Sequence, residues 1–153
     1  NGGNTILLIY PPHEEKFYLQ KVHEQYANEF IIDISHELVN YLDDLSMPTV
    51  EELLKEYGPS SHQIFHSGST TNDLFSRIIE KIKSAESENK IPILVRTGAL
   101  FGTGISNHEI MDEKVVRELN VPLVIFYPAT IINEQLMFLN CKPSPGYRAQ
   151  VIN

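Results

Sequence analysis

A glycine-rich stretch contains the residues that come nearest to a phosphate-binding motif. It reads Gly98-Ala99-Leu100-Phe101-Gly102-Thr103-Gly104-Ile105-Ser106. A phosphate-binding loop of the Walker A type carries a lysine before its Ser or Thr, and this stretch has none. The dinucleotide-binding pattern also fails, because its third glycine would stand where the chain has Asn107. The glycines therefore favour a tight backbone exit from a strand. A nucleotide-binding loop is the alternative.

The histidines suggest a second chemistry, metal binding. His62 and His66 lie four residues apart, the spacing that places two imidazoles on one face of a helix. The glutamate of a metalloprotease helix is missing between them. Cys141 is the only cysteine, so no intramolecular disulfide can form, and no cysteine-hydrolase signature surrounds it. The pattern favours a surface histidine pair and an incidental thiol, and we predict no catalytic residue, cofactor or metal site.

Arg96 is the most informative charged residue, because it ends a strand that is otherwise apolar. A guanidinium in that position needs a carboxylate, a carbonyl or a bound anion to offset its desolvation. A structural ion pair is the favoured interpretation, and contact with an anion or a partner is the alternative. Tyr147 and Arg148, near the end of the chain, are open to the same two interpretations.

The elements that must position these residues are indicated by apolar runs. Ile91–Val95 and Val121–Tyr127 flank the glycine-rich stretch and are apolar almost throughout, which is typical of parallel strands covered on both faces. Thr5–Tyr10 and Phe30–Ile34 are two further buried strands, joined by a segment long enough for a right-handed helical crossover. Helical spacing of apolar residues predicts one helix after Glu14-Glu15 and others over Glu37–Asp43, Val50–Tyr57 and Asp73–Glu86.

Capping residues and turns complete the expected layout. Ser35 is expected to cap the second helix, a Thr49–Glu52 capping box the third, and Asn72 or Thr71 the fourth. The polar stretch Ser60–Thr71 is expected to be a loop. Gln135–Leu139 and Tyr147–Ile152 are predicted as two short strands of a hairpin that turns at Pro143–Gly146.

Together these elements predict one α/β domain over residues 1–153. It has three layers, a mostly parallel sheet with helices on both faces, and a short antiparallel pair at the C-terminal end. The net charge of −8 disfavours direct binding to a phosphate backbone. No apolar run approaches the ~20 residues of a membrane span. The single cysteine suits a reducing compartment, so we expect a cytoplasmic protein.

Five motifs, in order along nearly the whole chain, resemble the BrxB family, the small component of bacteriophage-exclusion (BREX) defence systems and long a domain of unknown function. They are Tyr10-Pro11-Pro12-His13-Glu14-Glu15, Gly98-Ala99-Leu100-Phe101, Val121-Pro122 through Phe126-Tyr127-Pro128, Gln135-Leu136, and Tyr147-Arg148-Ala149. The family tends to have an additional N-terminal helical segment and a Pro with an Arg-x-His element after the Gly-Ala-Leu-Phe motif. Here Gly102-Thr103-Gly104 follows instead, and His108 is set differently.

The resemblance implies a non-enzymatic adaptor that binds a PglZ-like phosphatase-family component, with a DNA methyltransferase and a large ATPase as further partners. A cryptic nucleotide-binding or hydrolytic α/β enzyme is the alternative. Loops that leave the carboxyl ends of the central strands are the expected docking edge. Leu100 and Phe101 either form an exposed anchor there or fold inward over the core. The candidate partner-binding residues are Arg96, Gly98, Leu100, Phe101, Tyr127, Pro128, Gln135, Tyr147 and Arg148.

Overall fold

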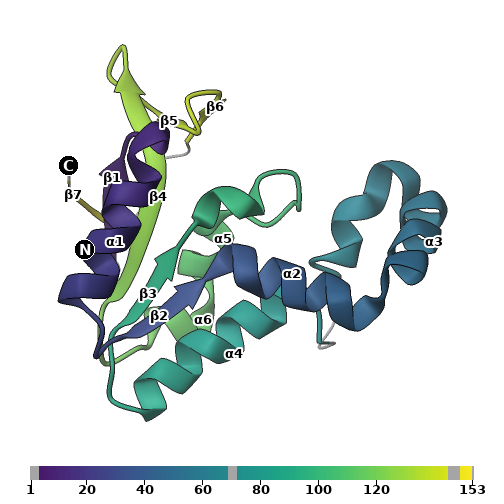
Figure 1. The fold of residues 1–153 in the computed structure, drawn as a ribbon, viewed down its shortest axis with the longest axis horizontal. Helices are drawn as coiled ribbons and strands as arrows, with labels where there is room; N and C mark the ends of the chain where they lie inside the picture. The colour runs from purple at the N-terminus through teal and green to yellow at the C-terminus, as the bar shows by residue number, and fades with distance from the viewer. Residues whose placement is uncertain (1–3, 69–71, 145–148, 153) are drawn as a thin grey trace.

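A five-stranded parallel sheet forms the centre of the computed structural model, which describes residues 4–68, 72–144 and 149–152 (Figure 1). The strand order is β2-β3-β4-β1-β7. The bounds of these strands are β1 Thr5–Tyr10, β2 Phe30–Asp33, β3 Pro92–Val95, β4 Leu123–Ile132 and β7 Gln150–Ile152. In the centre, Leu7 pairs with Ile125 and Leu94 pairs with the same residue from the other side. The four predicted core strands are therefore confirmed, and so is the α/β class.

Helices cover both faces of the sheet. α1 (Glu15–Gln25) packs on one face, where Val22 joins a small buried cluster with Ile93, Val95 and Phe126. α4 (Leu74–Ser87), α5 (Asn107–Asp112) and α6 (Lys114–Arg117) cover the other face, over the larger core. Alternate residues of β4 serve the two clusters, since Leu123 and Ile125 face the larger core and Phe126 faces the smaller. This explains why the central strands are apolar throughout.

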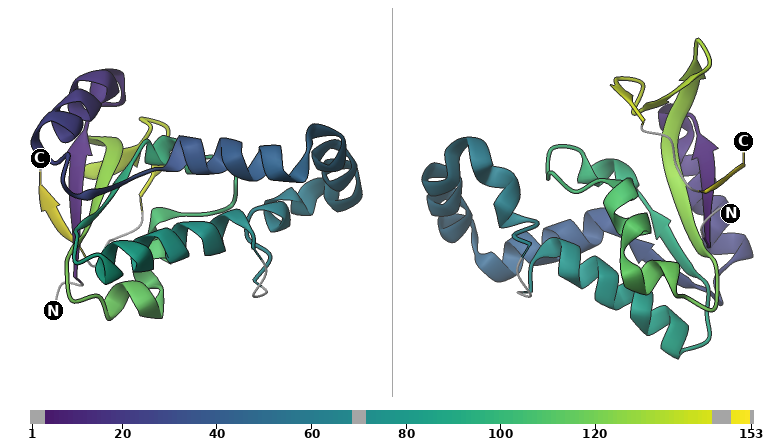
Figure 2. Two further views of the ribbon diagram at one scale, coloured as in Figure 1. Left: turned by 60° about the horizontal axis from the view of Figure 1, so that its bottom comes forward. Right: turned by 180° about the vertical axis from the view of Figure 1, so that it is seen from behind.

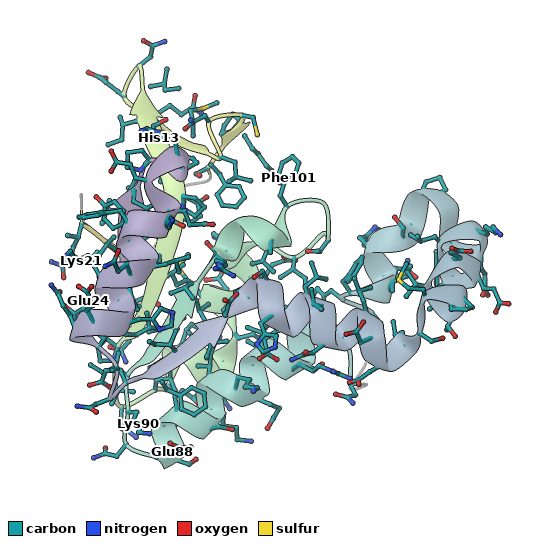
Figure 3. All side chains as sticks on the ribbon, viewed as in Figure 1. His13, Lys21, Glu24, Glu88, Lys90 and Phe101 are labelled. Atoms are coloured by element: carbon teal, nitrogen blue, oxygen red, sulfur yellow. The ribbon has the colours of Figure 1, made fainter. Side chains whose placement is uncertain are left out.

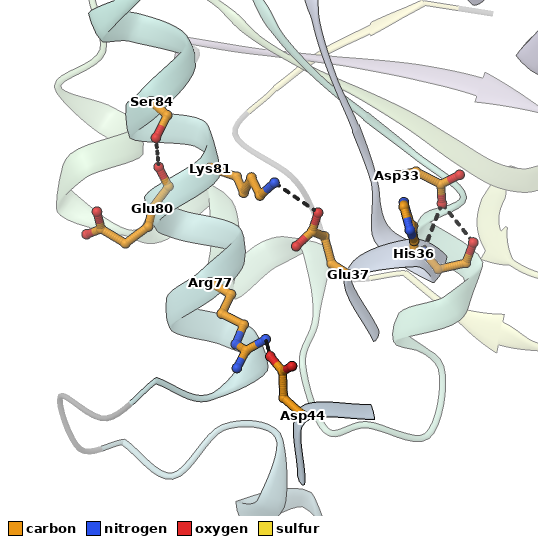
Figure 4. Close-up of polar contacts among 9 residues, drawn as sticks. Asp33, His36, Glu37, Asp44, Arg77, Glu80, Lys81 and Ser84 are labelled. Atoms are coloured by element: carbon orange, nitrogen blue, oxygen red, sulfur yellow. Dashed lines mark hydrogen bonds and ion pairs between the residues drawn. The ribbon is translucent and has the colours of Figure 1, made fainter. Parts of the chain in front are cut away.

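α2 (Ile34–Leu45) extends away from the sheet and leads into α3 (Met47–Tyr57) and a 3-10 helix, η2 (Gly58–Ile64) (Figures 1 and 2). α4 runs beside α2, and two ion pairs bridge them (Figure 4). Arg77 contacts Asp44 at 2.6 Å, and Lys81 contacts Glu37 at 3.4 Å. η2 returns from the end of this extension toward the sheet (Figure 2). The predicted loop Ser60–Thr71 is therefore helical in its first part, up to Ile64, and its residues 69–71 lie outside the described residues.

The predicted caps are wrong, although the helices themselves are present. Asp33, not Ser35, caps α2 by accepting hydrogen bonds from the backbone N–H groups of Ser35 and His36. No side-chain cap forms at α3, which starts directly at Met47. Asp73 caps α4 in place of Asn72 or Thr71. At both α2 and α4 an aspartate takes the cap position, because its carboxylate can accept from N–H and hydroxyl groups of the first turn at once.

Asp73 is a buried carboxylate that accepts hydrogen bonds from two serines. It accepts from the N–H and hydroxyl groups of Ser76 and from those of Ser67. Burial by itself would raise the pKa of Asp73, but these hydrogen bonds outweigh it and hold the pKa below its ordinary value. The ionised Asp73 carboxylate therefore connects the start of α4 to Ser67, in the segment after η2.

The predicted antiparallel pair at the C-terminal end is confirmed, but its second strand is not the one predicted. β4 does not end at Tyr127 but continues through Pro128 to Ile132, and its far half pairs antiparallel with β5 (Gln135–Phe138). The antiparallel pair at this end consists of β5 and β6 (Lys142–Pro143). β7 instead joins β1 in parallel at the edge of the sheet. Asn133 and Glu134, between β4 and β5, both have positive φ, the geometry of a two-residue type I′ hairpin.

Within the ranges described above, no helix is both long and apolar enough to cross a membrane.

Candidate functional site

A short 3-10 helix, η3 (Thr97–Leu100), turns the chain sharply after β3 and fixes the start of the glycine-rich loop. The Thr97 hydroxyl is fully buried and donates to the Phe126 carbonyl of β4 at 2.8 Å. Gly98 lies against the β4–β5 hairpin, because a Cβ there would be 3.2 Å from the Leu139 side chain. The loop is therefore anchored to β4 and to the hairpin from its first residues.

The second half of the loop depends on its glycines. Gly102 and Gly104 have φ values of +87° and +81°, which L-residues with side chains rarely adopt. Between them the buried Thr103 hydroxyl donates to the Leu100 carbonyl and accepts from the Ile105 N–H. A Cβ on Gly104 would lie 2.4 Å from that of His62. Both glycines thus serve the backbone, and Gly104 lets η2 approach the loop.

A cavity of about 590 Å³ lies between this loop, η2 and the β5–β6 strands. It opens beside the carboxyl ends of β3 and β4, where open parallel sheets usually bind ligands. Its lining combines apolar rings with hydroxyl, amide and cationic groups. The side chains that characterise it are those of His62, Phe101, Asn107, Tyr127, Phe138 and Lys142.

The aromatic wall of the cavity is formed by Tyr127 and Phe138, whose rings stack with centroids 4.9 Å apart. The Tyr127 and Ser144 hydroxyl oxygens lie 2.6 Å apart, and this contact holds the ring in place. Across from them the loop presents two apolar neighbours with opposite environments. Leu100 is 2% exposed and belongs to the core, whereas Phe101 is 56% exposed and stands out from the loop (Figure 3).

One polar group in the lining is unsatisfied. Asn107, the first residue of α5, is only 4% exposed. Its Oδ1 has no hydrogen-bond partner in the part of the chain that the structure describes. Leaving a buried acceptor unpaired costs about 1–3 kcal/mol, so such a group calls for an explanation. Ser106, next to it, is fully engaged in a capping box with Glu109.

The structure brings some of the predicted site residues together and separates others. Leu100, Phe101 and Tyr127 line the cavity. Gly98 and the buried Pro128 pack beneath the loop. Gln135 is exposed at the start of β5, outside the lining. Tyr147 and Arg148 lie outside the described residues.

Arg96 does not line the cavity but turns toward the end of β2. Its guanidinium lies 3.3 Å from Asp33 and 3.5 Å from the Ser35 hydroxyl. The favoured interpretation from the sequence, a structural ion pair, matches this geometry. Its backbone has a φ of +53°, which is unusual for a residue with a side chain.

Four of the residues that characterise the cavity were not predicted as site residues. His62 was considered only for metal binding, Asn107 only as a missing glycine, Phe138 only as part of a strand, and Lys142 carried no signal at all. They come from η2, α5, β5 and β6, which are brought together only by the fold. His66, the other member of the histidine pair, stacks on Phe75 with a centroid distance of 4.0 Å.

Among the residues that the structure describes, no group of three or more His, Cys, Asp or Glu side chains is placed to hold a metal ion. A second polar cluster lies on the α1 side of the sheet, where the Tyr10 hydroxyl donates to Glu15 at 2.9 Å. Burial, followed by this hydrogen bond, raises the pKa of Tyr10 well above its ordinary value. That cluster is therefore a neutral phenol paired with a carboxylate.

No family model, curated protein or solved structure shows a significant match to the chain.

Proposed function

We propose that this chain is a non-enzymatic interaction module that docks a partner protein at the carboxyl edge of its sheet, with Phe101 as the anchor. The observation that carries the proposal is the exposure of Phe101, 56%, on a loop in which Leu100 and Thr103 are buried. A large ring held in solvent by a fixed loop is the kind of residue that dominates the energy of protein interfaces.

The loop is built to present that ring rather than to let it collapse. Leu100 inserts into the core directly before it, and the Thr103 hydroxyl closes the turn directly after it. Phe101 is therefore fixed between two buried residues. Because the interface needs little ordering of this segment, the entropic cost of docking is reduced.

The resemblance to the BrxB family supplies the proposed partner, a PglZ-like component of a BREX defence system. An adaptor in such a system binds other proteins and performs no chemistry itself. This assignment rests on the sequence motifs given above. The exposure of Phe101 supports docking in general and does not distinguish one partner from another.

The test compares two exposed phenylalanines in binding to a purified PglZ-like protein of a BREX system. Phe17 on α1 is also 56% exposed, so Phe17→Ala removes the same ring from the same degree of exposure on a different face. Biolayer interferometry with the purified partner should show Phe101→Ala weakening the complex by about 2 kcal/mol, close to thirtyfold in Kd. Phe17→Ala should leave the Kd unchanged within about twofold.

Equal effects of the two substitutions would count against docking at this loop, and absence of binding by the wild-type chain would count against the partner. A catalytic role would appear differently, as turnover of a nucleotide by the chain alone.

A further inference from the structure

We propose that the cavity beside the Gly98–Gly104 loop binds a small organic anion with a flat apolar body. The cavity, of about 590 Å³, has the size of a small-molecule site. This inference does not rest on the docking proposal, because it concerns the interior of the cavity and is carried by Lys142, Asn107 and the Tyr127–Phe138 pair; the two proposals share only Phe101.

The charge of the lining favours an anion. The chain carries 20 acidic residues and a net charge of −8. Among the described residues that line the cavity, however, none is acidic, and Lys142 and His62 are present on different walls. The nearby Glu109 carboxylate is already bonded to the N–H and hydroxyl groups of Ser106. A lysine without a lining carboxylate makes this cavity more favourable to an anion than the acidic surface elsewhere on the chain.

The unpaired Asn107 provides the second, independent observation. Its side chain is 4% exposed, it lines the cavity, and its Oδ1 has no partner in the described structure. Natural proteins seldom leave a buried acceptor unsatisfied unless the group has a role. This oxygen is itself closed off from solvent, so a ligand with a hydrogen-bond donor next to its anionic group, such as an arylamine, would pair with it once the Asn107 amide turns toward the cavity. Asn107 then contributes to specificity, and the fold tolerates the unpaired state.

The apolar wall determines the shape of the ligand. Tyr127 and Phe138 form a stacked pair fixed by the Tyr127–Ser144 contact, and Phe101 stands at the opposite side. Aromatic rings bind best to flat partners in offset or edge-on arrangements. The ligand class is therefore an aromatic or heteroaromatic ring that carries a sulfonate, carboxylate or phosphate.

The experiment uses anilinonaphthalene sulfonate as the probe, because it combines flat rings, an N–H donor and one negative charge, and its fluorescence rises on binding. Its uncharged parent, phenylnaphthylamine, has the same rings and N–H without the anion, and inorganic sulfate has the anion without the rings. We expect saturable binding of one sulfonate probe per chain, with phenylnaphthylamine at least about tenfold weaker. Equal affinity for the charged and uncharged probes would overturn the proposal.

Two variants test the named residues. Lys142→Glu places a carboxylate in the lining and should weaken the sulfonate probe by about tenfold or more. The matched control is Lys90→Glu, the same charge change at an exposed lysine beside Glu88 on another part of the surface (Figure 3), and its effect should stay within about twofold because distant surface charges are screened. If Lys142→Glu and Lys90→Glu weaken probe binding equally, the effect comes from the net charge of the chain, and the cavity is refuted as the binding site.

Asn107→Leu removes the amide and keeps the shape. If the amide is retained for a ligand, this variant should unfold at the same or a higher denaturant midpoint than the wild type and bind the sulfonate probe about tenfold more weakly. Unchanged affinity in a folded variant would refute the role of Asn107.

Changes in backbone amide chemical shifts on adding the sulfonate probe show where it binds, independently of the affinities of the variants. The largest probe-induced shifts are expected at Gly102, Gly104 and Asn107. Shifts concentrated instead at Phe17 or at the exposed edge residues Val151 and Ile152 would place the probe on a different apolar surface and overturn the proposal.

Discussion

Leu100 and Phe101 are adjacent in the chain, but truncation of each should affect stability very differently. Leu100 is 2% exposed and lies in the main core, so Leu100→Ala removes buried methyl groups and leaves a cavity. Such substitutions cost about 2–5 kcal/mol. Phe101 is 56% exposed, so less than half of its ring is removed from water in the folded state. Full burial of a Phe contributes about 1.5–3 kcal/mol, and Phe101→Ala should therefore cost about 1 kcal/mol or less.

Urea unfolding of both variants, followed by circular dichroism, measures the difference directly. Equal m-values would show that the midpoint shifts report stability and not a change in the unfolded state. We expect Leu100→Ala to lose at least about 1 kcal/mol more than Phe101→Ala. If Phe101→Ala costs about 3 kcal/mol or more, the ring is buried in solution. The proposal that Phe101 anchors a partner, and the description of the cavity as open beside Phe101, would then both be refuted.

Three further predictions concern backbone strain and one titrating cap. Gly104→Ala should lower the free energy of unfolding by about 3 kcal/mol or more, because the new Cβ would clash with His62 and the backbone φ is unfavourable for alanine. Gly102→Ala has a similar φ but open space around the new Cβ, so it should cost only about 1–2 kcal/mol in thermal unfolding. Asp73→Ala should lose about 0.5–2 kcal/mol at neutral pH. Because the folded pKa of Asp73 lies below its unfolded value, this difference is fully present above the unfolded pKa and disappears as pH falls through the folded pKa, which urea unfolding at several acidic pH values would show. Arg96→Gly should leave the free energy of unfolding nearly unchanged. It relieves about 1 kcal/mol of left-handed backbone strain and loses an exposed ion pair with Asp33 of similar size. A loss of about 2 kcal/mol or more in chemical unfolding would show that this ion pair is far stronger than its exposure suggests.

The sheet could be predicted because its central strands are buried on both faces. Thr5–Tyr10 is predicted and observed with the same bounds, since its residues from Leu7 to Tyr10 alternate between the two clusters. The end of β4 could not be predicted. Pro128 resembles a strand terminus in sequence, but the chain continues beyond it because the residues from Ala129 onward find antiparallel partners in β5. A local pattern does not show that a distant partner will extend a strand.

The pairing partner of β7 was predicted wrongly for a related reason. The predicted strand that precedes it in the sequence, Gln135–Leu139, was the obvious hairpin partner, whereas β1 is far away in the chain and close in the fold. The partner of an edge strand is decided by the whole topology, and a short run such as Gln150–Ile152 carries too little pattern to choose.

The candidate site was located correctly only in part. The carboxyl ends of β3 and β4 could be predicted to meet, because parallel strands present their ends at one edge. The sequence could not decide between Leu100 and Phe101 as the exposed residue, since both are large, apolar and in the same turn. The contributions of His62 and Lys142 depend on how η2 and β6 pack, and this packing has no local signature.

The two proposals are linked through Phe101, which is both the docking anchor and part of the cavity lining. A ligand in the cavity and a partner on the loop would therefore change each other's affinity, and linkage requires the same factor in both directions. The Kd of the partner measured with saturating anilinonaphthalene sulfonate, divided by its Kd without the probe, must equal the corresponding ratio for the probe with and without saturating partner. A ratio of one in both experiments would mean that the partner does not touch the cavity mouth. Docking would then use another surface, even if the cavity binds its anion as proposed.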